Sequence, residues 1–164
     1  MSLFGTVPPT VSTQYSLDGL APRFRVQVLA ILGDMLREGH DPLIVESMRS
    51  DDRQRFLYGF GRDYDDGRGI VTNSAEGKNS WHFYGLAVDV VSRSRLWKAP
   101  PEFWSALGAS AARRELTWGG NWPNFPDKPH VQFPSRGLSS PTSHIIELYD
   151  SGGLVSVWTE LSAL

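Results

Sequence analysis

The stretch that most restricts the fold of this chain is LAVDVV, residues 86–91, an apolar run with an aspartate inside it. Its β-branched residues favour a strand. Alternate side chains of a strand point to the same face, which places Asp89 beside Ala87 and Val91. An unpaired buried charge is strongly unfavourable, so the fold must supply Asp89 with an arginine, a set of hydrogen-bond donors or a metal ion.

Segments on both sides of this strand have the patterns of further helices and strands. Apolar residues at helical intervals predict a helix over 20–39, and a leading proline predicts another over 100–116. Ser50 or Asp51 can cap a shorter helix, and the tail from Pro141 predicts a helix followed by a short terminal element. Short apolar runs predict strands at residues 42–47, 69–72 and 130–133. Because helices and strands do not alternate regularly, we expect an α+β fold with a small, mostly antiparallel sheet flanked by helices.

The 164 residues are enough for a single domain, 1–164, whose core needs no disulfide. The chain has no cysteine, so a transition-metal site would have to use histidine and carboxylate ligands. A net charge of -2 does not provide the basic surface that nucleic-acid binding needs. No apolar run approaches the roughly 20 residues of a membrane helix. We expect a monomer that binds neither nucleic acid nor membrane.

Two histidines are candidate neighbours of the buried aspartate. His82 lies close to it in sequence, and His130 lies in a separate block further along the chain. His82 precedes Asp89 by seven residues, and a helix would hold the two about 10 Å apart, too far for one ion. A turn at Gly85 would instead fold His82 back towards Asp89. In the block DKPHVQF, Pro129 disfavours helix and leads into His130, which opens the next predicted strand.

His82, Asp89 and His130 together form a two-histidine, one-carboxylate set with an open fourth position, which is typical of catalytic zinc. Asp127 would then be free to act as general base. Each residue also has a simpler explanation. His82 could be a core histidine, His130 an ordinary loop residue, and Asp89 the partner of an arginine. The candidate arginines are Arg49, Arg53 and Arg62.

Other polar groups have simpler expected roles. His40 follows a helix-ending glycine and His144 begins the tail, and we expect both to be structural or exposed. The loop RDYDDGRG offers aspartate oxygens that could hold calcium. It lacks the later glutamate of a full calcium loop, which favours a solvated turn. The aspartates concerned are Asp63, Asp65 and Asp66.

Two sequence blocks together resemble those of one peptidase family. SWHFYGLAVD has the family's spacing of serine, histidine, glycine and aspartate, at Ser80, His82, Gly85 and Asp89. TWGGNWPNFPDKPHVQF has its tryptophan, paired glycines, acid and histidine, and SMRSDDRQRFLYGFGR resembles its arginine block. The chain is similar to the VanY-type D-alanyl-D-alanine carboxypeptidases and L-alanyl-D-glutamate endopeptidases, a branch of the LAS zinc metallopeptidases that includes phage endolysins. The similarity covers about residues 43–133 and omits the arm and helix 1–42 and the tail 141–164.

This resemblance implies a hedgehog-like LAS peptidase domain with one zinc ion. The zinc ligands that it implies are His82, Asp89 and His130. It also implies Asp127 as catalytic base and Arg49 as the cation that holds the substrate carbonyl or the developing oxyanion, with Arg53 as the alternative. Further candidates for substrate contact are Ser80, Trp81 and Trp118.

The function expected from the resemblance is hydrolysis of amide bonds in peptidoglycan stem peptides. An L-alanyl-D-glutamate endopeptidase acting as a phage or prophage endolysin is the leading interpretation. The first residues do not resemble a secretory signal, so we expect the protein to stay in the cytoplasm until it is released to the cell wall. A D-alanyl-D-alanine carboxypeptidase is the alternative, and a zinc-containing binding domain without hydrolysis is a rival from another class.

Overall fold

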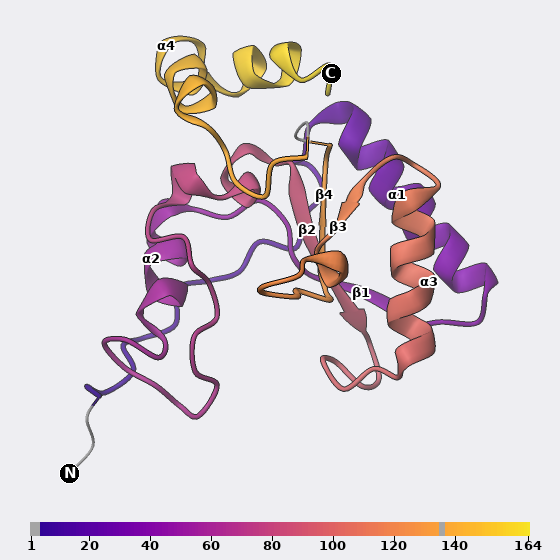
Figure 1. Cartoon of the computed structure of the whole chain (residues 1–164), viewed down its shortest axis with the longest axis horizontal. Coiled ribbons are helices and arrows are strands. Elements are labelled where there is room, and N and C mark those ends of the chain that lie inside the picture. The colour runs from indigo at the N-terminus through magenta and orange to yellow at the C-terminus, as the bar shows by residue number, and fades with distance from the viewer. Residues whose placement is uncertain (1–3, 135–136) are drawn as a thin grey trace.

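The computed structural model describes residues 4–134 and 137–164, and its centre is a four-stranded antiparallel sheet (Figure 1). The strands lie in the order β1-β2-β4-β3. Their bounds are Pro42–Glu46 for β1, Ala87–Ser92 for β2, Thr117–Trp118 for β3 and His130–Gln132 for β4. The strand that contains the aspartate, β2, therefore has a neighbour on each side to complete its hydrogen bonds.

Helices lie on both sides of this sheet. The α-helices are α1 Pro22–Arg37, α2 Asp51–Gly59, α3 Pro101–Ala112 and α4 Ser143–Glu160. The short 3-10 turns are η1 Gly77–Asn79, η2 Trp81–Tyr84 and η3 Gly119–Asn121. In Figure 1, α1 and α3 pack side by side on the right of the sheet, while α2 and the loop after it lie on the left. The expected α+β fold with a small antiparallel sheet and flanking helices is confirmed.

Local sequence signals explain where two of these helices begin. Pro22 is at the first turn of α1, where its missing N–H group does not break a helical hydrogen bond. The predicted apolar face of α1 is buried, including Phe24 and Met35. Ser50 caps α2, because its hydroxyl accepts a hydrogen bond from the backbone N–H of Arg53 at 3.1 Å.

The predicted strand at 69–72 is wrong. These residues form an irregular segment beside α2, and Ile70 and Val71 are 48% and 38% exposed. The segment finds its hydrogen bonds elsewhere: Thr72 accepts from the side chains of Gln54 and Arg62, each at 3.1 Å. β-branched residues favour a strand only when a neighbouring strand is available, and here side chains from α2 and the following turn take its place.

The tail packs onto the rest of the fold. Helix α4 is interrupted at Gly153, whose φ of 68° divides it into the longer helix and the terminal element that the sequence predicts. Val157 is buried, and Trp158 Nε1 donates to the carbonyl oxygen of Tyr84 at 2.7 Å. No helix in the described part of the chain is long and apolar enough to cross a membrane.

A bulge in β1 sets the register beside the buried aspartate. Ile44 lies opposite Val90, but Glu46 lies opposite Asp89, so β1 has one extra residue at this point. Such a bulge redirects the side chains that follow it. On its other side, Asp89 lies opposite His130 of β4. Strand pairing thus brings Glu46, Asp89 and His130 into one row across the sheet.

Candidate active site

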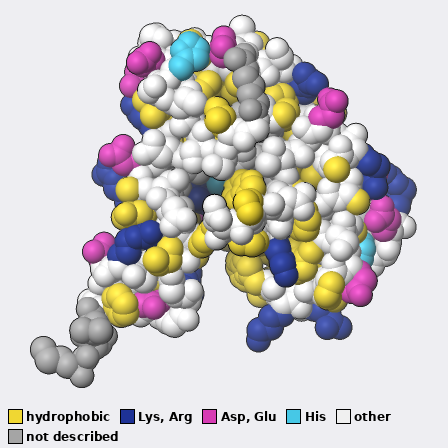
Figure 2. Space-filling view, in the orientation of Figure 1, with side chains coloured by type: hydrophobic (Ala, Val, Ile, Leu, Met, Phe, Trp, Pro, Cys, Tyr) yellow, Lys and Arg dark blue, Asp and Glu magenta, His cyan; other side chains and the backbone are white. Residues whose placement is uncertain are grey.

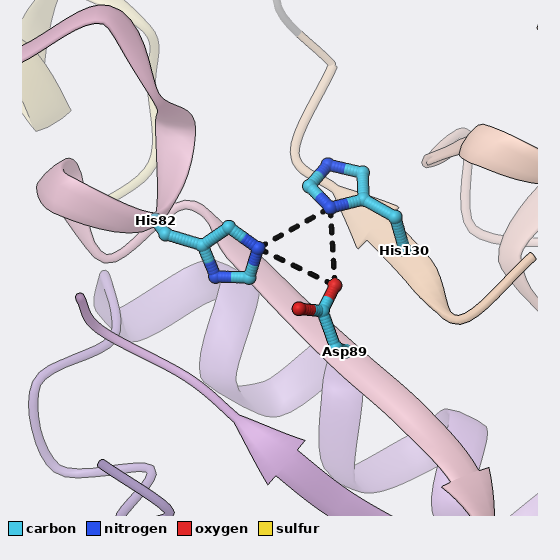
Figure 3. A group of neighbouring side chains, drawn as sticks. All are labelled: His82, Asp89 and His130. Atoms are coloured by element: carbon cyan, nitrogen blue, oxygen red, sulfur yellow. Dashed lines mark hydrogen bonds and ion pairs between the residues drawn. The ribbon is translucent and has the colours of Figure 1, made fainter. Parts of the chain in front are cut away.

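Three side chains converge beside β2 (Figure 3). Asp89 Oδ1 lies 3.2 Å from His130 Nδ1 and 3.4 Å from His82 Nε2. The two histidine nitrogens are 3.3 Å apart. One ligand atom from each residue lies within 4.8 Å of the others, so the three can reach a single ion.

His82 reaches this point because the 3-10 turn η2 folds the chain back. Gly85 ends the turn with a φ of 65°, in the left-handed region that favours glycine. A Cβ at position 85 would also clash with the carbonyl oxygen of Gly19. The turn predicted at Gly85 is therefore confirmed, and it shortens the distance that a helix would have imposed between His82 and Asp89.

The outer nitrogens of both histidines donate hydrogen bonds away from the centre. His82 Nδ1 lies 2.7 Å from the carbonyl oxygen of Ser47, which can only accept, so Nδ1 carries the proton. His130 Nε2 lies 2.9 Å from Gln132 Oε1, and the Gln132 amide nitrogen donates to Leu138, which fixes the orientation of this amide. Nε2 of His130 therefore also carries a proton. In the neutral rings, the inner nitrogens are left with lone pairs that face each other and the carboxylate.

Three acceptor atoms this close repel one another unless a proton or a cation lies between them. Two neutral imidazoles and a carboxylate are a donor set that suits zinc, and outer N–H groups bound to oxygen are the usual support of metal-binding histidines. The residues therefore fit a metal ion. Without a metal, a proton on His130 Nδ1 can bridge the contact. Burial lowers the pKa of His130, but its hydrogen bond to Asp89 and the negative charges of Asp89 and Asp127 together outweigh burial and raise it.

The other titratable groups have the charge states that such a site needs. Burial lowers the pKa of His82, and the positive charge of Arg49 lowers it further. Burial opposes ionisation of Asp89, but the charges and hydrogen bonds of the two histidines outweigh it and hold the pKa of Asp89 well below its usual range. Burial, followed by the negative charge of Asp89, raises the pKa of Asp127 to about 6. At neutral pH, Asp89 is thus ionised and His82 is neutral.

Arg49 lies against the outer oxygen of the buried aspartate. Its Nη2 donates to Asp89 Oδ2 at 3.3 Å and to Glu46 Oε2 at 3.1 Å, while its Nη1 donates to Gln54 Oε1 at 2.9 Å. Arg49 Nε is buried and has no hydrogen-bond partner within the described residues. Of the partners that the sequence left open for Asp89, an arginine therefore contacts Oδ2, while Oδ1 lies beside the two histidines.

The other two candidate arginines do not contact Asp89. Arg53 Nε donates to Glu46 Oε1 at 3.0 Å, and its Nη1 donates to the carbonyl oxygen of Val11 at 3.1 Å. Arg62 donates to two backbone carbonyl groups in its own part of the chain. Glu46 is thus shared by Arg49 and Arg53, and it holds both cations at the cleft.

Asp127 lies on the loop that leads into β4. Its backbone N–H donates to the carbonyl oxygen of Gly119 at 2.9 Å, and its own carbonyl accepts from the N–H of His130 at 3.2 Å. A Cβ at Gly119 would clash with the backbone of Asp127, so glycine permits this close approach. The Asp127 carboxylate lines the same cleft as the three converging residues and has no hydrogen-bond partner among the residues described. It is available to act as a base.

The converging residues line a cleft of about 920 Å³. Figure 2 shows a hollow near the middle of one face, with basic and histidine side chains at its floor and hydrophobic side chains beside it. Much of the lining comes from α2, the loop after it and the loop before β4, and β1, η2, β2 and β4 also contribute side chains. Thr13 and Tyr15 of the arm also line the cleft, although the arm lies outside the region of sequence resemblance.

The three predicted substrate-contact residues lie in different environments. Ser80 lines the cleft, whereas Trp81 borders it but is only 2% exposed and belongs to the core. Trp118 packs against Gly108 and Gly120, donates through Nε1 to a backbone carbonyl group, and is not part of the cleft lining. Trp118 therefore supports the loop before β4. Substrate contact by Ser80, Trp81 and Trp118 stays a prediction.

Two supporting residues were not predicted from the sequence. Gln132 fixes the proton position of His130, and its place two residues further along the same strand is a signal that could have found it. Glu46 holds Arg49 and Arg53. Its position depends on the bulge in β1, for which the sequence has no evident signal.

The aspartate loop after α2 is a turn held by its own hydrogen bonds. Asp65 Oδ1 accepts from the N–H groups of Gly67 and Gly69 at 3.1 Å and 3.0 Å. Asp66 forms an ion pair with Arg68. Across residues 4–134 and 137–164, the convergence beside β2 is the only group of three or more acids and histidines that could hold a metal ion, so the calcium alternative has no support.

The remaining histidines take no part in the cleft lining. His40 packs edge-on against Phe103, with ring centroids 5.8 Å apart. His144 is exposed on α4, and its Nε2 lies 3.5 Å from a carboxylate oxygen of Glu160. Both positions agree with the structural or exposed roles expected from the sequence.

Two comparisons of sequence relate this chain to known peptidases. Residues 73–133 match the model of a protein family described as D-alanyl-D-alanine carboxypeptidase, and this segment contains the converging residues and Asp127. The chain is also 28% identical over 124 residues to the peptidoglycan L-alanyl-D-glutamate endopeptidase CwlK of Bacillus subtilis. That match covers 69% of this chain and 72% of the Bacillus protein.

Two solved structures are similar to this fold in part. The L-Ala D-Glu endopeptidase ChiX of Serratia marcescens has a TM-score of 0.48 and 24% identity, over 73% of this chain and 84% of that one. The LD-carboxypeptidase LdcB has a TM-score of 0.41 and 13% identity, over 94% of this chain and 76% of that one. Both TM-scores lie below 0.5, so the fold class rests on the sheet order and helix arrangement described above.

Proposed function

We propose that this chain, whose residues 73–133 match the D-alanyl-D-alanine carboxypeptidase family model, is a zinc-dependent hydrolase of peptidoglycan stem peptides. One observation carries the proposal: His82, Asp89 and His130 converge with their outer N–H groups turned away. A cluster with only a structural task would not leave three acceptor atoms facing one another in a cleft. Zinc is the proposed ion because it suits two imidazoles and one carboxylate.

When bound, zinc acts as a Lewis acid on a substrate carbonyl and lowers the pKa of a coordinated water. Asp127 is the proposed general base, which accepts a proton from the attacking water on its carboxylate and returns it to the nitrogen of the leaving amine. Burial raises the pKa of the Asp127 carboxyl, which makes it a stronger base than an ordinary aspartate. The Asp127 carboxylate has no hydrogen-bond partner within the described residues. It can therefore turn from the attacking water to the nitrogen of the leaving amine.

Arg49 has two tasks in this proposal. Its Nη2 holds Asp89 Oδ2, so that Oδ1 stays directed at the centre of the cluster. Its charge also lies beside the position where negative charge would develop on the substrate carbonyl, and a fixed donor of this kind contributes about 3 kcal/mol to transition-state stabilisation. The hydrogen bonds from Arg49 to Glu46 and Gln54 hold the guanidinium in place before the reaction, so no free energy is spent on orienting it in the transition state.

The proposed cleavage site is the bond between L-alanine and D-glutamate. This choice is supported by the similarity to CwlK, which is named for that activity. Removal of a terminal D-alanine is the second candidate, because the matching family model is described by that activity. A role as a phage or prophage endolysin is our prediction from the family resemblance, together with its expected residence in the cytoplasm before release to the wall.

Mass spectrometry of peptidoglycan fragments, after incubation with the protein with and without a chelator, tests this proposal. New amino-terminal glutamate on released stem peptides, lost with chelator and regained with zinc, is the expected result. Loss of a single terminal D-alanine would identify the carboxypeptidase instead. A protein that binds zinc stoichiometrically but changes no fragment would be a non-catalytic binding domain, and the proposed function would be wrong.

A further inference from the structure

Trp97 is the only exposed tryptophan among the six of this chain, with 63% of its surface accessible. The other five are buried or half-buried. A tryptophan side chain has a large apolar surface, and its contact with water is unfavourable unless another molecule covers it. Trp97 lines the cleft that contains His82, Asp89 and His130. Part of its surface therefore borders the cleft proposed to take the substrate.

Several hydrogen bonds fix the turn that carries this tryptophan. Asp41 accepts from the hydroxyl of Ser92 at 2.7 Å and from the N–H of Ser94 at 2.8 Å. The N–H of Leu96 donates to the carbonyl oxygen of Ser92 at 2.7 Å. Leu96 has a φ of 51°, in the left-handed region that leucine rarely adopts, and such strain persists only where surrounding bonds hold it. The backbone position of Trp97 is therefore set by the fold.

Trp97 belongs to an aromatic wall, which we define as Trp97, Trp122 and Phe125. All three side chains line the cleft. The ring centroid of Trp122 lies 5.1 Å from that of His130, so Trp122 adjoins the converging residues. Phe125 is 41% exposed. Trp122 thus offers a flat apolar surface next to the groups proposed to hold zinc, and Trp97 and Phe125 offer exposed aromatic surfaces along the same cleft.

The chemistry of the proposed substrate indicates what covers this wall, and this step rests on the proposed endopeptidase function. In peptidoglycan, the L-alanine of the stem peptide is joined to the lactyl group of an amino sugar. A bond between L-alanine and D-glutamate therefore lies one residue, about 3.5 Å of chain, from the group that carries the sugar. An enzyme that cuts this bond must accommodate the sugar in or beside its cleft. An enzyme that removes the terminal D-alanine at the other end of the stem need not do so.

We infer that Trp97 is a specificity residue, which stacks against the pyranose ring of the sugar that carries the stem peptide. The C–H face of a pyranose is apolar and can cover an indole ring, while its hydroxyl groups point sideways into water. Only a glycan-linked stem peptide brings such a ring to Trp97. The enzyme therefore prefers the glycan-linked peptide to the free peptide.

Steady-state kinetics on two substrates tests this inference. One substrate is an N-acetylmuramyl tetrapeptide, and the other is the same tetrapeptide with an acetyl group in place of the sugar. Trp97→Ala is expected to raise KM for the sugar-linked substrate about tenfold, with kcat nearly unchanged, and to leave the sugar-free substrate unaffected. Leu36→Ala is the matched control, because Leu36 is 62% exposed on α1 and takes no part in the cleft lining.

An equal loss on both substrates, or no loss on either, would overturn the inference. If the wild-type protein cleaves neither substrate, the proposed function is wrong, and the binding of the sugar-linked substrate then decides the role of Trp97. Calorimetry on the wild-type and Trp97→Ala proteins is expected to show a dissociation constant about tenfold weaker in the variant. Equal dissociation constants would show that Trp97 does not contact the sugar.

Discussion

Two aspartates, Asp34 on α1 and Asp89 on β2, both lie among basic side chains, but their oxygen atoms have opposite surroundings. Every partner of Asp34 is a donor, and these bonds fasten α1 to α3. Its Oδ2 accepts from Ser110 at 2.7 Å, Arg113 at 3.0 Å and Arg114 at 2.6 Å, and its Oδ1 accepts from Arg37. The hydrogen bonds from Arg114, Ser110 and Arg113 hold the pKa of Asp34 well below its usual range.

Only one oxygen of Asp89 meets a group that is a donor in every protonation state. Arg49 donates to Oδ2, whereas Oδ1 faces the inner nitrogens of His82 and His130, whose neutral rings carry their protons on the outer nitrogens. The difference shows that basic neighbours alone do not distinguish a structural carboxylate from one at a candidate metal site. A carboxylate whose two oxygens both accept hydrogen bonds from donors has a structural role. One whose lone pairs face other lone pairs requires a cation.

Asp89→Ala is the test with the largest expected effect, because it removes a proposed ligand. We expect zinc affinity to fall by more than about a hundredfold and hydrolysis of peptidoglycan fragments to be lost. Zinc per protein, measured by mass spectrometry after gel filtration, and fragment hydrolysis are the readouts. Asp34→Ala is the matched control and should retain both. A metal-loaded, active Asp89→Ala protein would remove the distinction between the two aspartates.

Asp127→Asn separates catalysis from metal binding. Replacing the proposed base by an amide should lower kcat by roughly a hundredfold to ten thousandfold, since an amide cannot accept the proton. The zinc content should not change, because Asp127 is not one of the three converging residues. Kinetics and metal analysis on the same sample check both points. Loss of zinc from this variant would mean that Asp127 is a ligand rather than a base.

Glu46→Gln tests whether the ion pair between Glu46 and Arg49, which holds Arg49 against Asp89, contributes to zinc binding and activity. Glu46 is 6% exposed and binds both Arg49 and Arg53, so the substitution leaves two cations without their shared carboxylate. We expect a loss of about tenfold to a hundredfold in zinc affinity or activity, and a lower melting temperature. Glu38→Gln is the control, since Glu38 contacts Arg113 at the surface. Equal behaviour of the two variants would show that Glu46 does not support the site.

Asp34→Asn should have the smallest effect on function and a measurable effect on stability. Activity is expected to stay unchanged, while the melting temperature falls by a few degrees because charge-assisted hydrogen bonds between α1 and α3 weaken. The pKa of Asp34 is depressed in the folded state. Its stabilising contribution is therefore fully present above the pKa of the unfolded chain, about 3.9, and is lost as the pH falls below it.

The melting temperatures of the wild-type and Asp34→Asn proteins should therefore differ most at about pH 7 and approach each other towards about pH 3. Thermal unfolding followed by circular dichroism across this range measures the difference. A gap that stays constant with pH would mean that the contacts of Asp34 do not depend on its charge. Reduced hydrolysis of peptidoglycan fragments by the Asp34→Asn protein at neutral pH would mean that the role of Asp34 is not only structural.

Much of the fold was predictable because its signals are local. The apolar spacing of α1 and the Ser50 cap of α2 depend on residues within a few positions of one another. The turn that returns His82 to Asp89 depends on Gly85 alone. The strand predicted at 69–72 was wrong because a strand depends on contacts with a distant segment rather than on local signals. A strand needs a partner, and the residues that bind Thr72 belong to α2 and the turn after it.

The sequence by itself determined the kind of chemistry available to this protein. The order and types of residues, with no cysteine and with His82, Asp89 and His130 in two recognisable blocks, restrict the site to imidazole and carboxylate ligands. Only the tertiary structure decided which atoms meet. The β1 bulge places Glu46 opposite Asp89, and the partners of the two histidines set which nitrogen atoms face the centre. These are contacts between distant segments, and their geometry depends on strand register and packing, which no single stretch of sequence encodes.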